Sequence, residues 1–148
     1  MRSIVGMLRQ GEDEPSPQKR ISDLERLIAT GAQRPPIELD VRGDLDDVAP
    51  SIQTAVFRIA QEATTNARRH ARRATKIAVR IEEDQHDVIV TVADDGDAPS
   101  FDRKSSPGYG LVGMNERASL HGGSLHAGPN PGRGWTVKAV LPKQGQAR

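Results

Sequence analysis

The longest periodic pattern in the chain runs from Ser51 to about Ala71 and predicts an amphipathic helix. At about 100° per residue, an apolar stripe falls along one side of this helix and comprises Ile52, Val56, Ile59, Ala63 and Ala67. A polar stripe lies roughly 100° further round and comprises Arg58, Glu62, Asn66 and Arg69. Because the apolar stripe has to be buried against a sheet, we expect the polar stripe at the boundary between core and solvent, where a ligand site belongs.

The segments around this helix alternate between strand and helix patterns. Apolar residues at every second position predict strands at residues 37–41, 76–82, 87–93, 124–127 and 135–141. Further helices are predicted at residues 18–30 and 113–121, whereas the polar residues 97–107 predict a loop. Strand pairs interleaved with helices favour an α/β two-layer sandwich, that is, a mixed β-sheet with helices on one face.

The 148 residues suffice for one compact domain with a short extension. Residues 1–10 have the pattern of the end of an amphipathic helix, residues 11–17 are acidic and broken by proline like a linker, and residues 18–148 form the predicted domain. The formal net charge of +1 gives no argument for nucleic acid or a membrane as partner. The absence of cysteine excludes disulfides and thiolate metal sites, and no apolar run approaches membrane-spanning length.

A candidate metal ligand lies on the polar stripe of the long helix. Asn66 follows Glu62 by one helical turn within the segment Gln61–Asn66. A hard Mg²⁺ ion takes oxygen ligands and keeps several waters, so one amide oxygen together with nucleotide phosphates makes a sufficient site. The alternative is that Glu62 and Asn66 are simply the solvated side of an amphipathic helix, and this helix alone does not separate the two hypotheses.

A pair of carboxylates ends the strand pattern at residues 87–93, in the tripeptide Asp94-Asp95-Gly96. Adenine offers an exocyclic amine as a donor, and a buried carboxylate is a strong and directional acceptor for it. Taken alone, however, this tripeptide is more typical of an ordinary turn that closes a hairpin.

Gly108, Gly110 and Gly113 form a glycine-rich loop that leads into the helix predicted at residues 113–121. Their Gly-x-Gly-x-x-Gly spacing allows tight turns and close backbone approach, and the amides at a helix N-terminus favour phosphate. The same spacing indicates a dinucleotide fold when it follows a first strand within a βαβ unit. Here it comes late in the chain after a polar loop, so that interpretation is poor.

In this order, the three motifs resemble those of the ATP-binding (GHKL-type) domain of two-component sensor histidine kinases, over roughly residues 37–142. The segment Gly110–Arg117 is similar to the group of kinases that pair with nitrate- and desiccation-type (LuxR-like) response regulators, and Gly132–Thr136 resembles the last glycine box of the family. The chain departs from the family motif Asp-x-Gly-x-Gly at Ala98, which stands in place of the final glycine.

The resemblance implies a role for each matching residue. Asn66 would bind Mg²⁺, and Glu62 would orient a metal-bound water or act as a base. Asp94 would accept the adenine amine, with Gly96 giving close backbone approach. The other matches would contact the phosphates (Arg69 and His70), form the hinge of a lid over ATP (Gly108, Gly110, Leu111 and Gly113) or help close the adenine pocket (Thr136).

The implied activity is transfer of the γ-phosphoryl group of Mg-ATP to a histidine on a separate dimerisation (phosphoacceptor) domain of the same kinase, with a response regulator downstream. None of the four histidines lies on a helix of the acceptor type, so we expect the acceptor outside this chain. Residues 1–10 would be the tail of the dimerisation helix. The expected location is cytoplasmic, including the cytoplasmic part of a membrane-anchored sensor, without membrane contact by this segment.

Two other functions share the implied fold. One is a serine/threonine kinase of the anti-sigma-factor type, which acts on a partner protein, and the other is a nucleotide-binding module without transfer activity. The helix pattern at residues 1–10 and the segment 110–114 argue against the first. The basic run Arg68–Arg73 suggests nucleic acid, but cations complement a helix C-terminus and no aromatic residue is interleaved with them, so we expect no nucleic-acid partner.

Overall fold

The computed structural model describes residues 19–30, 34–97 and 109–145, and these contain one five-stranded sheet. The strands are β1 (Ile37–Arg42), β2 (Ile77–Glu83), β3 (Asp87–Asp94), β4 (Ser124–Pro129) and β5 (Trp135–Pro142). Their order in the sheet is β1-β2-β3-β5-β4. β1 and β2 run parallel and every other neighbouring pair is antiparallel, so the sheet is mixed, as predicted.

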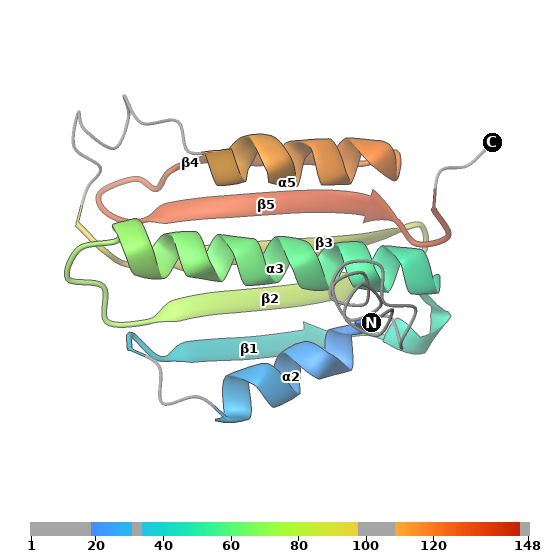
Figure 1. The fold of residues 1–148 in the computed structure, drawn as a ribbon, viewed down its shortest axis with the longest axis horizontal. Coiled ribbons are helices and arrows are strands. Elements are labelled where there is room, and N and C mark those ends of the chain that lie inside the picture. Colours follow the sequence, from blue (N-terminus) through green and yellow to red (C-terminus); the bar gives the residue numbers. More distant parts are fainter. Residues whose placement is uncertain (1–18, 31–33, 98–108, 146–148) are drawn as a thin grey trace, which may run out of the picture.

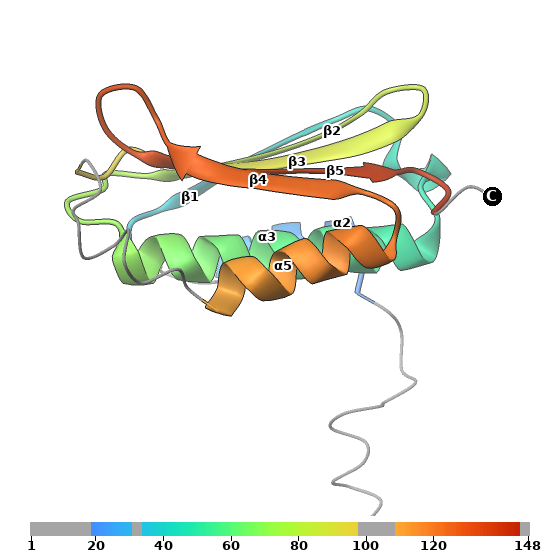
Figure 2. The ribbon, with the colours of Figure 1, turned by 90° about the horizontal axis from the view of Figure 1, so that it is seen from above.

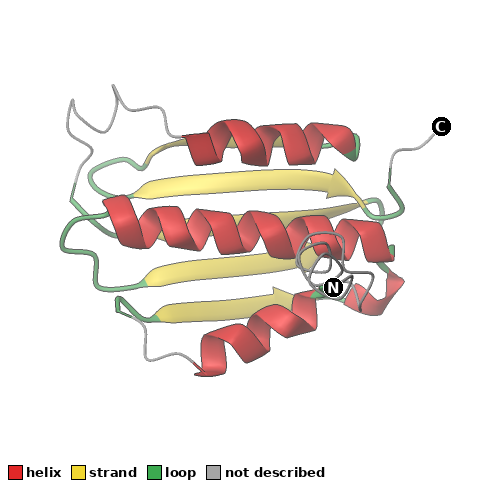
Figure 3. Ribbon diagram, in the orientation of Figure 1, coloured by secondary structure: helices red, strands yellow, loops and turns green. Residues whose placement is uncertain are grey.

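The α-helices of the described ranges are α2 (Ile21–Thr30), α3 (Pro50–His70) and α5 (Tyr109–Leu120), and a short 3₁₀ helix, η1 (Leu45–Asp47), precedes α3. The three α-helices lie on the same face of the sheet (Figure 2). α3 crosses the middle of that face, with α2 and α5 on either side of it (Figure 1, Figure 3). The predicted two-layer sandwich is therefore confirmed. None of the described helices has the length and apolar character needed to cross a membrane.

The core lies between α3 and the sheet. All residues of the predicted apolar stripe are buried: Ile52, Val56, Ile59, Ala63 and Ala67. They belong to one cluster with the alternating apolar residues of the strands, among them Val79, Ile81, Val88, Val90, Val92, Val137 and Leu141. Because each fully buried Val, Leu or Ile side chain contributes about 1.5–3 kcal/mol, this contact holds the two layers together.

The start of α5 corrects one prediction. The helix begins at Tyr109 and not at Gly113, so Gly110 and Gly113 are helical rather than part of a loop. Leu111 packs against the core, and Met114 is 1 % exposed, three residues later on the same side. Burial of this side outweighs the low helix propensity of glycine, about 1 kcal/mol per residue.

The other predicted boundaries agree with the observed ones to within a few residues. The predicted helix tail at residues 1–10, the linker at residues 11–17 and nearly all of the predicted loop at residues 97–107 lie outside the described residues.

The turn between β4 and β5 is pressed against the end of β3. Gly134 has a φ of +98°, and a Cβ built on it would lie 2.2 Å from the carbonyl oxygen of Asp94. Gly132 in the same turn also has a positive φ, +88°, but a Cβ there would meet nothing within 4 Å. Two separate features therefore require glycine at position 134: the positive φ of its backbone and its close approach to β3.

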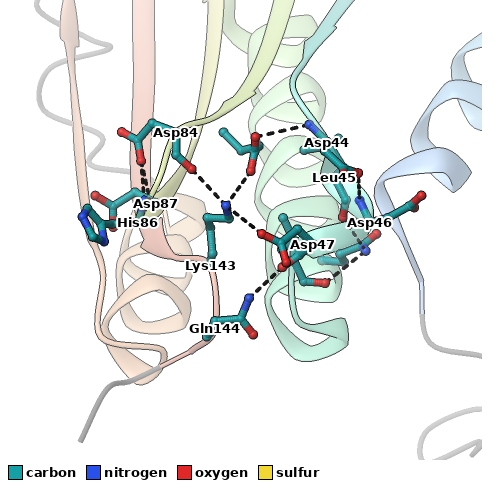
Figure 4. A network of polar contacts seen from close by, with 12 residues as sticks. Asp44, Leu45, Asp46, Asp47, Asp84, His86, Asp87, Lys143 and Gln144 are labelled. Carbon is teal, nitrogen blue, oxygen red and sulfur yellow. Dashed lines mark hydrogen bonds and ion pairs between the residues drawn. The ribbon is translucent and has the colours of Figure 1, made fainter.

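At the opposite end of the sheet, Lys143 joins β5 to two neighbouring segments (Figure 4). Its side chain is only 9 % exposed, and its Nζ lies 2.6 Å from Oε2 of Glu83 and 3.0 Å from Oδ2 of Asp47. The same ammonium donates to the carbonyl oxygen of Asp84 at 3.0 Å. The end of β5 is thus fastened both to the turn after β2 and to η1, next to the start of α3.

The ion pair shifts the titration of both partners. The hydrogen bond between the two side chains is the largest cause that lowers the pKa of Glu83 below its ordinary value of 4.5 and raises the pKa of Lys143 above 10.5. The pair therefore stabilises the fold fully at pH values between the two ordinary pKa values, 4.5 and 10.5. Its contribution is lost as the pH falls through the lowered pKa of Glu83, or rises through the raised pKa of Lys143.

Replacing Lys143 by methionine should lower the melting temperature near neutral pH, because Glu83 keeps its charge and loses its partner. The difference from the wild type should shrink as the pH falls below the ordinary pKa of 4.5 and through the lowered pKa of Glu83, because Glu83 then becomes protonated. Melting followed by circular dichroism checks both statements. Arg42→Met is the matched control, since it removes an exposed pair with Asp40 (3.0 Å) and should change the melting temperature little. A difference that stays constant across this pH range would contradict the assigned role of the pair.

Gly134→Ala should destabilise the domain more than Gly132→Ala. Both variants carry the cost of a side chain at positive φ, about 1–2 kcal/mol. Only Gly134→Ala also has to displace the carbonyl of Asp94, which should add about 1–3 kcal/mol. Urea denaturation measures both free energies of unfolding. Equal losses would show that the turn can move away from β3 without cost.

Candidate functional site

The predicted site residues that the structure describes lie toward one end of the sandwich. α3 and β3 end there, and β5 and α5 begin there, at the left of Figure 1. The backbone N–H of Asp97, just after β3, donates to the carbonyl oxygen of Arg72, just after α3, at 2.8 Å. The polar end of α3 is therefore held directly beside the residues that follow β3.

Asp94 is the last residue of β3, and the residue is only 5 % exposed. Because the buried residues of β3 alternate as Val88, Val90 and Val92, the side chain of Asp94 points to the same, helix-covered face. Its Oδ1 accepts the N–H of Gly96 at 2.9 Å. Among the residues that the structure describes, Asp94 is the one buried acid, and burying a carboxylate is costly unless hydrogen bonds compensate it.

Asp95 has a different role from Asp94. Its Oδ1 accepts the N–H groups of Thr75 (2.7 Å) and Lys76 (3.2 Å), and its Oδ2 accepts the hydroxyl of Thr75. The bond from this hydroxyl is the largest cause that lowers the pKa of Asp95. Asp95 thus fastens the end of β3 to the start of β2. Of the two acids, Asp94 is the candidate for binding and Asp95 holds the backbone.

Gly96 and Arg133 complete the backbone support around Asp94. A Cβ on Gly96 would lie 3.0 Å from the carbonyl oxygen of Arg72 and 3.1 Å from Oδ1 of Asp94, so the backbone is closely approached on two sides. Nε of Arg133, in the β4–β5 turn, donates to the carbonyl oxygens of Asp95 (2.9 Å) and Gly96 (3.3 Å). Arg133 is not among the predicted site residues, because nothing local to residue 133 indicates a contact with a segment so far away in the chain.

The predicted residues of α3 lie along its polar stripe near its C-terminal end. Glu62, Arg69 and His70 are exposed, whereas Asn66 is half-buried beside Ala67, which packs into the core. Asn66 lies one turn before the end of the helix, about 6 Å along its axis. Of the predicted stripe, Asn66 lies between core and solvent as expected, whereas Arg58, Glu62 and Arg69 are exposed.

The glycine motif falls largely in the first turns of α5. Gly110, Leu111 and Gly113 belong to this helix, and Gly108 lies outside the described residues. Leu111 packs against the core. Gly113 is exposed, and a Cβ on it would meet nothing within 4 Å. Nothing in the described fold requires glycine at this position, although glycine in a helix costs about 1 kcal/mol relative to alanine.

Thr136 does not face Asp94, contrary to the expectation that it helps close a pocket around the base. β3 and β5 pair so that Ala93 lies opposite Thr136 and Asp94 lies opposite Trp135. Because successive residues of a strand point to opposite faces, Thr136 lies on the open face of the sheet. Its hydroxyl donates there to Oδ1 of Asn130 at 2.5 Å. On β5, the residue beside Asp94 is Trp135, which is not among the predicted site residues.

A family model described as "Histidine kinase-, DNA gyrase B-, and HSP90-like ATPase" matches residues 51–145 of the chain. This range contains α3 from its second residue onward and all of β2, β3, α5, β4 and β5, and it includes Lys143. All the site residues described above lie within it.

Curated relatives align with most of the chain. It is 31 % identical over 124 residues to the signal transduction histidine-protein kinase/phosphatase DegS of Brevibacillus brevis, covering 82 % of this chain and 32 % of that protein. It is 35 % identical over 125 residues to the sensor histidine kinase MctS of Rhizobium johnstonii, covering 81 % of this chain and 27 % of that protein. The chain therefore spans about a third or less of the length of these relatives.

Solved structures share the fold. The histidine kinase AdeS of Acinetobacter baumannii superposes with a TM-score of 0.61 at 13 % identity, over 96 % of this chain and 76 % of that chain. The blue-light activated histidine kinase of Erythrobacter litoralis EL346 superposes with a TM-score of 0.60 at 23 % identity, over 82 % of this chain and 39 % of that chain. Since the family model matches more than half of its length, the chain belongs to the family of histidine kinase-, DNA gyrase B- and HSP90-like ATPases.

Proposed function

We propose that the chain is the Mg-ATP-binding catalytic domain of a two-component sensor histidine kinase. In this function it donates the γ-phosphoryl group of ATP to a histidine on a separate dimerisation domain. Membership of the ATPase family and the likeness to proteins named as sensor histidine kinases support this proposal. The structural observation that carries it is the buried carboxylate of Asp94 at the end of β3.

Asp94 has the properties needed to recognise adenine. A carboxylate shielded from water accepts the exocyclic amine of the base through a charge-assisted hydrogen bond, which is roughly twice as strong as a neutral one. The N–H of Gly96 orients Oδ1 of Asp94 before any nucleotide arrives. Asp95 does not compete for this role, because both of its oxygens accept hydrogen bonds from Thr75 or Lys76.

On this proposal, the phosphates and Mg²⁺ lie along the polar stripe of α3. The amide oxygen of Asn66 is a hard donor of the kind that Mg²⁺ takes together with water and phosphate oxygens. Glu62, one turn earlier, orients a metal-bound water or acts as a base, while Arg69 and His70 offset phosphate charge. Bound Mg²⁺ would neutralise charge on the transferred group, and the protein's part is chiefly to position the reactants.

The start of α5 would bind the phosphates from the other side. The N-terminal amides of a helix favour anions, and Gly113 leaves open space where the fold itself needs no glycine. Gly108 would give the backbone freedom before this helix and Gly110 would do so in its first turn, with Leu111 anchored in the core. Thr136 is not included in the proposed site, because it lies on the other face of the sheet.

The histidine that accepts the phosphoryl group would belong to the dimerisation domain. Residues 1–10 would be the tail of the helix of that domain. Within the chain, His70 ends α3, His86 lies between β2 and β3, His121 follows α5 and His126 lies in β4. A response regulator of the nitrate- and desiccation-type (LuxR-like) group would receive the phosphoryl group next. The proposed location of this segment is the cytoplasm, where ATP is available.

Asp94→Asn should weaken ADP at least about tenfold, because the variant loses the charge-assisted part of the hydrogen bond to the base. Pyrophosphate, which has no base, should bind both proteins equally. Isothermal titration calorimetry measures both affinities. Asp95→Asn is the matched control and should lower the melting temperature without changing the preference for ADP over pyrophosphate. Equal losses for ADP and pyrophosphate in Asp94→Asn would mean that Asp94 supports the fold and does not bind the base.

The same titrations separate the metal from the base. Asn66→Ala should abolish the gain in ADP affinity that Mg²⁺ produces, while leaving the metal-free affinity unchanged. Thr65→Ala, at the exposed neighbouring position, should behave like the wild type. If Asn66→Ala kept the full effect of Mg²⁺, the ion would have to be held elsewhere.

The chain alone should bind ATP without becoming phosphorylated, because its four histidines occupy other structural contexts. Mixed with a fragment that carries the acceptor helix of the same kinase, it should transfer label from γ-labelled ATP to that fragment. Acid-labile label on the chain alone, mapped to His70, His86, His121 or His126, would contradict the proposed separation of acceptor and catalytic domain. Acid-stable label on a serine or threonine of a partner protein would favour a kinase of the anti-sigma-factor type.

A further inference from the structure

The first residue of β5 lies directly beside the buried acid of the site. In the pairing of β3 with β5, Trp135 is opposite Asp94. Directly opposed residues of an antiparallel pair project to the same face, with Cβ atoms about 4.5–5.5 Å apart. Trp135 also begins the alternation that continues with Val137, Ala139 and Leu141, all of them buried on the helix-covered face. The indole and the carboxylate of Asp94 therefore share one face of the sheet.

Trp135 is neither a core residue nor a surface residue. It packs against the hydrophobic core but keeps part of its surface exposed, unlike Val137 and Ala139 further along the strand. The helix-covered residues later in β5 are buried, whereas Trp135, at the first position of the strand, keeps part of its surface exposed. The residue therefore lies beside the buried acid, at the place where the proposed site meets solvent.

The position of Trp135 is determined on both sides. Gly134, immediately before it, is packed against the carbonyl oxygen of Asp94, and its own carbonyl oxygen accepts the N–H of Asn130 at 2.9 Å. Thr136, immediately after it, donates to Oδ1 of Asn130. With both neighbours held by the turn, the Cα of Trp135 has little freedom to move relative to Asp94.

We propose that Trp135 is a base-contacting residue that determines how tightly the site takes a nucleotide. The proposal rests on the proposed function and adds an aromatic surface to the polar recognition by Asp94. Nucleobases stack on aromatic side chains regardless of their hydrogen-bonding edge. Asp94 would therefore choose adenine by its amine, while Trp135 would supply affinity for the flat base itself.

The chain offers a direct test, because Trp135 is its only tryptophan. Adding ADP to the wild-type protein should change the tryptophan fluorescence in a saturable way, with the same dissociation constant as calorimetry gives. Pyrophosphate should bind without this change, since it has no base. Excitation at wavelengths where tyrosine does not absorb restricts the signal to Trp135.

Substitutions then separate contact with the base from support of the fold. Trp135→Leu should weaken ADP about five- to a hundredfold while leaving pyrophosphate unchanged, and Trp135→Phe should recover most of the affinity because it restores an aromatic surface. Lys138→Ala, on the same strand but exposed on the open face, is the control and should bind both ligands like the wild type. Trp135→Phe keeps the test usable if Trp135→Leu does not fold.

The outcomes distinguish this inference from the function on which it rests. If the wild type shows no calorimetric binding of ADP, the proposed function itself fails. If ADP binds but the fluorescence of Trp135 does not respond and Trp135→Leu retains full affinity, nucleotide binding stands and the role of Trp135 is refuted. Equal weakening of ADP and pyrophosphate in Trp135→Leu would also refute it, because the residue would then act only through the fold.

Discussion

The packing of α3 across the sheet is the contact on which the rest of the structure depends. Its apolar stripe uses Ile52, Val56 and Ile59 in the first half of the helix and alanines such as Ala63 and Ala67 toward its end. Large aliphatic side chains contribute most of the burial energy, about 1.5–3 kcal/mol each, and small ones let the end of the helix lie close to β3. With one side of α3 committed to the sheet, the polar residues near its C-terminal end lie at the end of the sandwich where β3 ends.

A buried charged residue lies at each end of the sheet, and the two residues have different partners. At one end, Lys143 is buried together with the carboxylate of Glu83 and an oxygen of Asp47, so that its charge is compensated within the protein. At the other end, Asp94 is the buried acid, with backbone N–H support from Gly96 and with Asp95 and Arg133 holding the surrounding backbone. The first arrangement stabilises the fold, and the second holds the carboxylate that we propose as the ligand for adenine.

Much of the architecture follows from periodicity, because burial of an apolar face acts on every turn or strand. The spacing within residues 51–71 predicts both stripes of α3, and alternation predicts the strands. The predicted start of α5 at Gly113 is wrong. The low helix propensity of glycine is a local preference of about 1 kcal/mol, and the burial of Leu111 and Met114 outweighs it. The contact of Arg133 with residues 95 and 96 was out of reach, since it joins segments that only the folded sheet brings together.

By itself, the sequence predicted which residues carry the polar chemistry: Asn66 on the polar side of a helix, an acidic pair at a strand end and a glycine motif that falls largely in the first turns of a helix. Through the resemblance it assigned Asp94 and Thr136 to the adenine pocket, but it could not show which face of the sheet each of them occupies. Neighbouring residues of a strand face opposite sides, and the side that matters depends on which strands are paired and in what register. The pairing of β3 with β5 made that decision, placing Asp94 beside Trp135 under the helices and Thr136 on the open face.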